Sequence, residues 1–410
     1  MKNDIVTTEK IYKNRIEVKF QSTEEKPLSG FQLPEFMNNI SKYYYKLDLI
    51  NEISRYINEG SEVKNIFIIS DSFEINNQYK HLRKCKDINL DKPIDVEKLY
   101  NLGKPISMFP NDKFIRINLV FKLYEKIYTY FNKNKIDKLS KKYLSTYINS
   151  DFNDTLTKIE NDCNIIIKNQ VSDKDDILDK TNQIKKYIKE VDGEYKAYLK
   201  DSQRINMFEE LICKTESEIT EEQKIEYRDI EKKYFRRFFT YLKTLDRPIV
   251  GVFDESSNNI NILKSEYMFN DRESESFLDY KDYSHNSPFV ITLIAGFALA
   301  EIVYIVWKNL KENKTIISKQ EENDALKEEN RKEINDLLEE IANSDELNQN
   351  KNVKNNYVRE KLSIVKEKTQ KSSKNVLKRY KVANNKMIIN LDDYKQRKIQ
   401  IEKEKNQEHK

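Results

Sequence analysis

The sequence predicts an α+β N-terminal region, then one apolar transmembrane helix, then a charged and mainly helical tail. Three observations predict this class: short alternating runs near the start, longer runs with a three- and four-residue apolar period, and one late apolar stretch. The 410 residues are enough for two or three domains. We expect five parts: a β-α-β module with a loop-rich connector (1–110), a mostly helical region ending in a β-hairpin (111–286), the transmembrane helix (287–310), an acidic helix with a short coiled coil (311–350), and a basic, partly disordered tail (351–410).

The first part opens as strand, helix and strand. RIEVKFQ (15–21) alternates polar and apolar residues, which is typical of a half-buried strand. A helix follows from Pro34 to Gly60, since proline suits a first turn and glycine a C-terminal cap. NIFIISDSFEI (65–75) predicts the second strand, bent near Asp71. The apolar face of the helix comprises Phe36, Met37, Ile40, Tyr44, Leu47, Ile50, Ile53 and Ile57.

The second part contains helices and one hairpin. Helices are expected over 114–131, 174–200 and 203–214, the first of them capped by Asp112. Thr220 and Gln223 form a capping-box pattern that opens a further helix reaching about Leu245. The runs RPIVGVF and INILKSEYMF flank DESSNN, which predicts a β-hairpin.

The segment 288–307 is apolar apart from Glu301. Twenty residues at a rise of 1.5 Å span about 30 Å, the hydrocarbon thickness of a bilayer. Its eleven Phe, Val, Ile and Leu residues contribute about −5 kcal/mol to insertion, against roughly +2.5 to +3.5 kcal/mol for one acidic residue. The sum favours a transmembrane helix. The alternative is a buried core helix.

Small residues surround the single charge of this segment. Their spacing predicts a helix–helix contact at which the Glu301 carboxyl is buried, so we expect the helix to self-associate. The alternative is a glutamate that the helix merely tolerates. The contact residues are Ala295, Gly296, Ala298, Ala300 and Glu301.

The expected orientation is contradictory. No secretory signal precedes the N-terminal region, which predicts that this region stays in the cytosol beside the membrane. Four lysines in 308–322 against one basic residue in 273–287 instead place the C-terminal side there. A core helix would remove the conflict.

Charge divides the tail. Residues 308–350 carry 7 basic and 12 acidic side chains, whereas residues 351–410 carry 18 basic and 7 acidic ones. The basic part is a candidate for binding anionic lipid or nucleic acid, and the alternative is a solvated tail. KKYFRRFFTYLK (232–243) mixes cations and aromatic rings, although at helical spacing the rings form a core face. The candidate basic residues are Arg236, Arg237, Lys374, Lys378, Arg379 and Lys381.

Residue patterns that carry chemistry are scarce. All six glycines are isolated, so no phosphate-binding loop and no nucleotide are predicted. His81 and Cys85 are too few for a metal site. The three cysteines are widely spaced, which indicates a reducing compartment without a disulfide framework. We therefore predict neither cofactor, metal nor catalytic residue.

These observations predict a non-enzymatic, single-span membrane protein that binds a protein partner or acts as a sensor, and that forms homo-oligomers through its span. Two alternatives remain: an oligomerising membrane effector, and a soluble nucleic-acid-binding or scaffold protein with 288–307 as a core helix.

Overall fold

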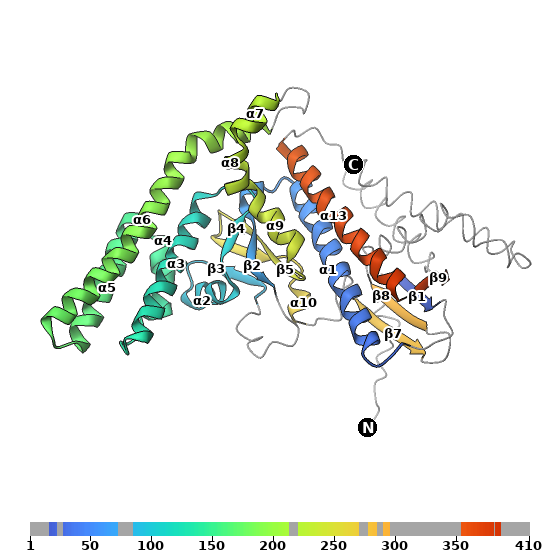
Figure 1. Ribbon diagram of the computed structural model, residues 1–410, viewed down its shortest axis with the longest axis horizontal. Helices are drawn as coiled ribbons and strands as arrows, with labels where there is room; N and C mark the ends of the chain where they lie inside the picture. Colours follow the sequence, from blue (N-terminus) through green and yellow to red (C-terminus); the bar gives the residue numbers. More distant parts are fainter. Residues whose placement is uncertain are drawn as a thin grey trace, which may run out of the picture. The chain divides into compact units, whose positions relative to one another are not determined.

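A computed structural model describes residues 16–22, 28–72, 85–212, 220–269, 278–284, 290–295, 354–380 and 382–386 (Figure 1). The chain divides into two compact units. The first comprises Met1–Asn58, Phe269–Lys351 and Ser363–Lys410; the second comprises Glu59–Met268 and Asn352–Leu362. The long helix α13 (Lys354–Arg379) therefore begins in the second unit and continues in the first.

The second unit is built on a five-stranded antiparallel sheet in the order β3-β6-β5-β2-β4. The predicted hairpin is confirmed, because β5 and β6 pair with Asp254 opposite Asn259. The predicted bend in β2 is also confirmed by an irregular register between Ile68 and Ser72. The strands are β2 (Ile66–Ser72), β3 (Asp87–Asn89), β4 (Pro105–Ser107), β5 (Pro248–Asp254) and β6 (Asn259–Ile262).

Strand β2 lies between β5 and β4 in this sheet. Its first four residues, Ile66–Ile69, are fully buried, as expected for a strand covered on both faces. Gly251 of β5 pairs with Phe67, and a Cβ atom at Gly251 would lie 2.6 Å from Cζ of that ring. The close approach of the phenylalanine therefore requires glycine at this position.

Helices pack around this sheet (Figure 1). The predicted helix of 114–131 is α3, and its apolar face is buried apart from the partly exposed Tyr128, but Asn111 rather than Asp112 caps it: the Asn111 side chain accepts from the Lys113 N–H. The helical elements from Glu59 to Phe269 are η2 (Val63–Asn65), α2 (Pro93–Leu102), α3 (Asp112–Lys133), η4 (Lys141–Tyr143), α4 (Leu144–Asn149), α5 (Phe152–Gln170), α6 (Lys174–Leu211), α7 (Glu221–Glu226), α8 (Arg228–Ile230), the π-helix η6 (Glu231–Phe235), α9 (Arg236–Thr244) and α10 (Glu266–Phe269).

Helix α6 replaces the two helices expected over 174–200 and 203–214. It runs without a break for 38 residues beside α5 and α3 (Figure 1). Two ion pairs, Lys122 to Glu194 and Lys126 to Glu190, each at 2.5 Å, join α3 to α6. Packing against these helices keeps α6 helical between the two predicted helices, where the apolar periodicity of the sequence is weak.

The segment from Thr220 to Thr244 is not one helix. The capping box of Thr220 and Gln223 is confirmed, but it opens only the short α7. A wider π-turn then interrupts the helix before α9. Phe235 at the end of this π-helix and Phe238 and Phe239 in α9 are all buried.

The first unit contains a four-stranded sheet in the order β7-β8-β1-β9. The two strands of the predicted β-α-β opening thus belong to different sheets, because β1 pairs with β8 and β9, whereas β2 pairs with β4 and β5. The first unit's strands are β1 (Ile16–Ser22), β7 (Asp279–Ser284), β8 (Val290–Ala295) and β9 (Val382–Lys386).

Helix α1 (Gln32–Asn58) confirms the first predicted helix. It ends just before Gly60, which adopts a left-handed φ of 95°. Seven of the eight predicted face residues are buried, and Met37 is partly exposed.

The predicted transmembrane helix is wrong. Val290–Ala295 form strand β8, which is paired on one side with β1 and on the other with β7. Backbone groups that bond to neighbouring strands are not available for a helix, and four of these six residues are β-branched, which favours a strand. The structure has no helix, in the part of the chain it describes, with the length and apolar character needed to cross a bilayer. The expected single-pass membrane localisation therefore loses its basis.

The remaining residues of 287–310 and the acidic helix of 311–350 lie outside the described residues. Of the basic tail, 354–380 and 382–386 are described, as α13 and β9.

Candidate functional site

The residues of the predicted helix–helix contact are not brought together as a helix face. Ala295 is the last residue of strand β8, where it pairs with Ile16. Gly296, Ala298, Ala300 and Glu301 lie outside the described residues.

The candidate basic residues at the start of α9 lie on the outside of a core helix. Phe235, Phe238 and Phe239 are buried, while Arg236 and Arg237 are exposed, so the core interpretation of this motif is confirmed. These rings are covered by the protein and are not available to stack on a base.

Arg236 is already engaged with a carboxylate. Its Nη2 donates to Oε2 of Glu231 at 2.7 Å, and the Tyr357 hydroxyl donates to Oε1 at 3.0 Å. Burial alone would raise the pKa of Glu231, but these hydrogen bonds and the charges of Arg236 and Lys361 outweigh it and lower that pKa below its usual value. Tyr357 in turn packs edge-on against Phe109, Phe208 and Phe239. The arrangement stabilises the second unit.

Lys374, Lys378 and Arg379 lie on α13, and Lys381 falls outside the described residues. Lys378 and Arg379 are exposed, and Lys374 is partly exposed. Two further exposed lysines, Lys368 and Lys371, lie on the same side of the helix, because residues three and four apart share a face. We call this set, Lys368, Lys371, Lys374, Lys378 and Arg379, the lysine face of α13.

The lysine face is strongly cationic. From residue 363 to residue 380 the chain holds six basic side chains and only one acidic one, Glu367. Lys368, Lys371 and Lys378 form no ion pair with any residue that the structure describes. Arg379 pairs with Glu35 at 3.1 Å. The positive charges of Lys368, Lys371 and Lys378 are therefore not neutralised by a described carboxylate and can contact an external partner.

The opposite side of α13 fixes the helix in the first unit. Its apolar stripe of Val365, Val376 and Leu377 is buried. Lys366 donates to Asn51 of α1 at 3.3 Å, and Tyr380 packs edge-on against Phe36 at 5.4 Å. These contacts, at opposite ends of α1, show that α1 and α13 run antiparallel (Figure 1). The cations are thus held on a rigid helix.

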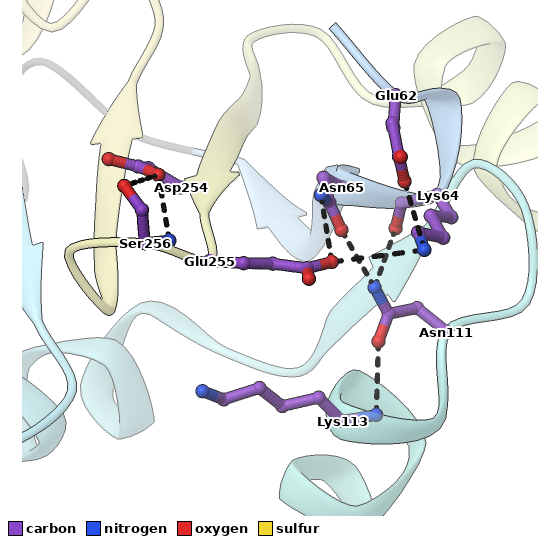
Figure 2. Close-up of polar contacts among 8 residues, drawn as sticks. All are labelled: Glu62, Lys64, Asn65, Asn111, Lys113, Asp254, Glu255 and Ser256. Atoms are coloured by element: carbon purple, nitrogen blue, oxygen red, sulfur yellow. Dashed lines mark hydrogen bonds and ion pairs between the residues drawn. The ribbon is translucent and has the colours of Figure 1, made fainter.

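A second polar cluster lies at one end of the five-stranded sheet (Figure 2). Asn111 donates to Oδ1 of Asn65 at 3.0 Å and to the Lys64 carbonyl at 3.1 Å, and Asn65 donates to Glu255 at 3.1 Å. Both asparagines are 9 % exposed. The chain of amides ties η2, the start of α3 and the β5–β6 loop together.

The charges around this cluster are balanced within it. Lys64 pairs with Glu62 at 2.9 Å and with Glu255 at 3.9 Å (Figure 2), and the hydrogen bond that its amine donates to Glu62 is the main reason why the pKa of Lys64 is raised. Lys113 differs, since partial burial lowers the pKa of its amine. Its Nζ donates to Asn258 at 2.5 Å and lies 4.5 Å from the centre of the Phe253 ring. Nearly every polar group of this cluster has a partner within the protein. The cluster therefore serves to stabilise the fold and is not a candidate binding site.

No three or more His, Cys, Asp or Glu side chains are grouped to hold a metal ion within the described ranges. Lys368 and Lys371 are not among the candidate residues predicted from the sequence, although their spacing from Lys374 and Lys378 indicates a shared helix face.

Comparison of the chain with known proteins identified no similar protein. No protein-family model, curated protein or solved structure matches this chain.

Proposed function

We propose that the protein binds nucleic acid, with the lysine face of α13 contacting the phosphate backbone. The observation that supports this is the row of exposed lysines on a helix whose other side is buried in the first unit. Lysines three or four residues apart along a helix are separated by about 4.5–6 Å of rise, comparable to the distance between successive phosphates. The membrane-anchored sensor and the membrane effector both depended on the transmembrane helix and are set aside.

An anionic lipid surface is the alternative partner, because it carries negative charge as nucleic acid does. Helices that lie on membranes insert an apolar face into the headgroup region. On α13 that face is already buried, and the exposed side carries one large apolar residue, Ile364. Nucleic acid, which is bound through charge without such insertion, is therefore favoured.

The test is binding of a fluorescein-labelled 20-nucleotide single strand to the full chain, followed by fluorescence anisotropy at about 50 mM salt. Replacing Lys368, Lys371 and Lys378 together by glutamine should weaken binding by about tenfold or more, because three phosphate contacts are lost.

The matched control replaces Lys186, Lys189 and Lys200 of α6 by glutamine. They are equally exposed and likewise lack an ion pair among the described residues, so this variant should bind as the unaltered protein does. Equal weakening by both variants would refute the lysine face as the site. Binding to vesicles with anionic lipid, but not to the oligonucleotide, would show that lipid is the partner instead.

A further inference from the structure

A second cationic surface follows α3 in the other unit. Between residues 131 and 143 the chain holds five lysines and one acidic residue, Asp137. Tyrosines lie on both sides of this loop, at Tyr128 in α3 and Tyr143 in η4. We call Tyr128, Lys133, Lys135, Lys138, Lys142 and Tyr143 the lysine–tyrosine surface.

Buried side chains and hydrogen bonds to α3 and α5 hold the loop that carries this surface in place. Ile136 and Leu139 are buried, and the Tyr124 hydroxyl donates to the Leu139 carbonyl at 2.5 Å. The Asp137 N–H donates to the side chain of Gln170 in α5 at 2.8 Å. Three residues of the loop are thus anchored, and Lys133, Lys135, Lys138 and Lys142 around them are exposed. A loop that is already ordered loses little conformational freedom when a ligand binds.

Two of the four lysines lie over the two rings. Lys138 Nζ lies 4.8 Å from the centre of the Tyr128 ring, and Lys142 Nζ lies 5.9 Å from that of Tyr143. A hydrogen bond from Lys138 lowers the pKa of the Tyr128 hydroxyl. Tyr143 is 46 % exposed, so much of its ring is open to solvent.

The nearby acidic groups do not neutralise this surface. Glu97 is 3.7 Å from Lys141, a fifth lysine of the loop, and Glu125 pairs with Lys104 at 3.0 Å. The four lysines of the surface form no ion pair within the part of the chain that the structure describes.

One lysine occupies a backbone conformation in which it is unusual. Lys135 follows the C-terminal cap of α3 with a φ of 58°, in the left-handed region where glycine or asparagine is favoured. The side chain is exposed and adds a cation where a glycine would relieve the backbone.

We infer that the lysine–tyrosine surface binds single-stranded nucleic acid, with the lysines on the phosphates and a base stacked on the exposed ring of Tyr143. Interleaved cations and aromatic rings suit a single strand, because its bases present their faces, whereas paired bases in a duplex do not. This site lies in the second unit and shares no residue with the lysine face of α13.

The experiment uses the full chain and a 20-nucleotide oligothymidylate that carries 5-iodouracil. After irradiation, the cross-linked peptides are identified by mass spectrometry. Cross-links should map to Tyr143 or Tyr128, because stacking places the base against the ring. Cross-links confined to other peptides, or an oligothymidylate that does not bind, would overturn the inference.

Two variants and a control measure the contribution to affinity. Tyr143→Leu should weaken oligothymidylate binding by about tenfold, as expected for one stacked base, and leave binding of a 20-base-pair duplex unchanged. Lys135→Gly suits its backbone conformation and removes one cation, so it should weaken binding without lowering the melting temperature. Tyr56→Leu is the control, since Tyr56 also lies beneath a cation, Arg55 at 4.8 Å. Equal weakening by Tyr56→Leu, or equal effects of Tyr143→Leu on single strand and duplex, would overturn the inference.

The cross-linking experiment distinguishes the lysine–tyrosine surface from the lysine face of α13. Cross-links found only on α13 would exclude the lysine–tyrosine surface and leave the proposed function standing. Cross-links at Tyr143 with no effect of the α13 glutamine variant would do the reverse.

Discussion

The salt dependence of binding measures how many cations of α13 contact phosphate. Each contact with a single strand contributes about −0.7 to the slope of log K against log salt concentration. Lys368, Lys371 and Lys378 are exposed, and none is paired with a described carboxylate, so each should contribute fully. Replacing these three by glutamine should therefore reduce the slope by about 2.

The same difference can be stated as affinity. When salt is raised from about 50 to about 200 mM, the binding constant of the unaltered protein should fall by a factor about 20-fold larger than the factor for the glutamine variant. Anisotropy titrations at four or five salt concentrations give both slopes. Slopes that agree within about 0.5, or an equal change in the α6 control, would refute the assignment of these lysines to phosphate contacts.

Three other predictions concern stability and reactivity. Gly251→Ala should lower the free energy of unfolding by about 1–3 kcal/mol in urea titrations, because its Cβ would lie 2.6 Å from the Phe67 ring; an unchanged midpoint would contradict that packing. Burial raises the pKa of the Cys163 thiol to about 12, so in the native protein at pH 8 it should not react with Ellman's reagent until urea is added. Tyr357→Phe should cost about 1.5–3 kcal/mol, since it removes a hydrogen bond to a charged carboxylate. Because the folded-state pKa of Glu231 is lowered, this cost should be full above about pH 4.5 and disappear as the pH falls through that lower pKa; a cost that persists in acid would contradict the role of the carboxylate.

Local patterns in the sequence predict local structure well. The apolar face of α1, the cap at Gly60, the capping box at Thr220 and the hairpin around DESSNN all depend on residues close together in the chain. The core face of α9 is predicted for the same reason, because a helical period separates its rings from its arginines.

The apolar segment could not be assigned in this way. A run of apolar residues suits a membrane helix, a core helix or a buried strand, and its own length favoured the first. What decides the structure of Val290–Ala295 is the presence of β1, more than 260 residues earlier, as its pairing partner. Neither periodicity nor an insertion sum contains that information. The same remoteness explains why β1 and β2, neighbours in sequence, belong to separate sheets.

The candidate sites were predicted in part. Lys374, Lys378 and Arg379 were identified from composition, but the tail was expected to be partly disordered. A mainly helical tail is predicted, but the buried stripe of Val365, Val376 and Leu377 that orders this helix is not, because basic residues outnumber the apolar residues here. The lysine–tyrosine surface was missed because lysine is abundant throughout the chain. Only the structure shows which lysines are left without acidic neighbours.

The central position of β1 in the first unit's sheet has a consequence for synthesis. Its partners β8 and β9 end roughly 270 and 360 residues after β1 does, so at about 5–20 residues per second they emerge some 15–70 s later. The second unit draws nearly all of its residues from one continuous stretch, Glu59–Met268, and can begin to fold during that interval. A newly made β1 meanwhile presents two unpaired edges, each able to bind other strands. Strand β1 is therefore translated well before either of its pairing partners, and it needs protection by a chaperone until they are made.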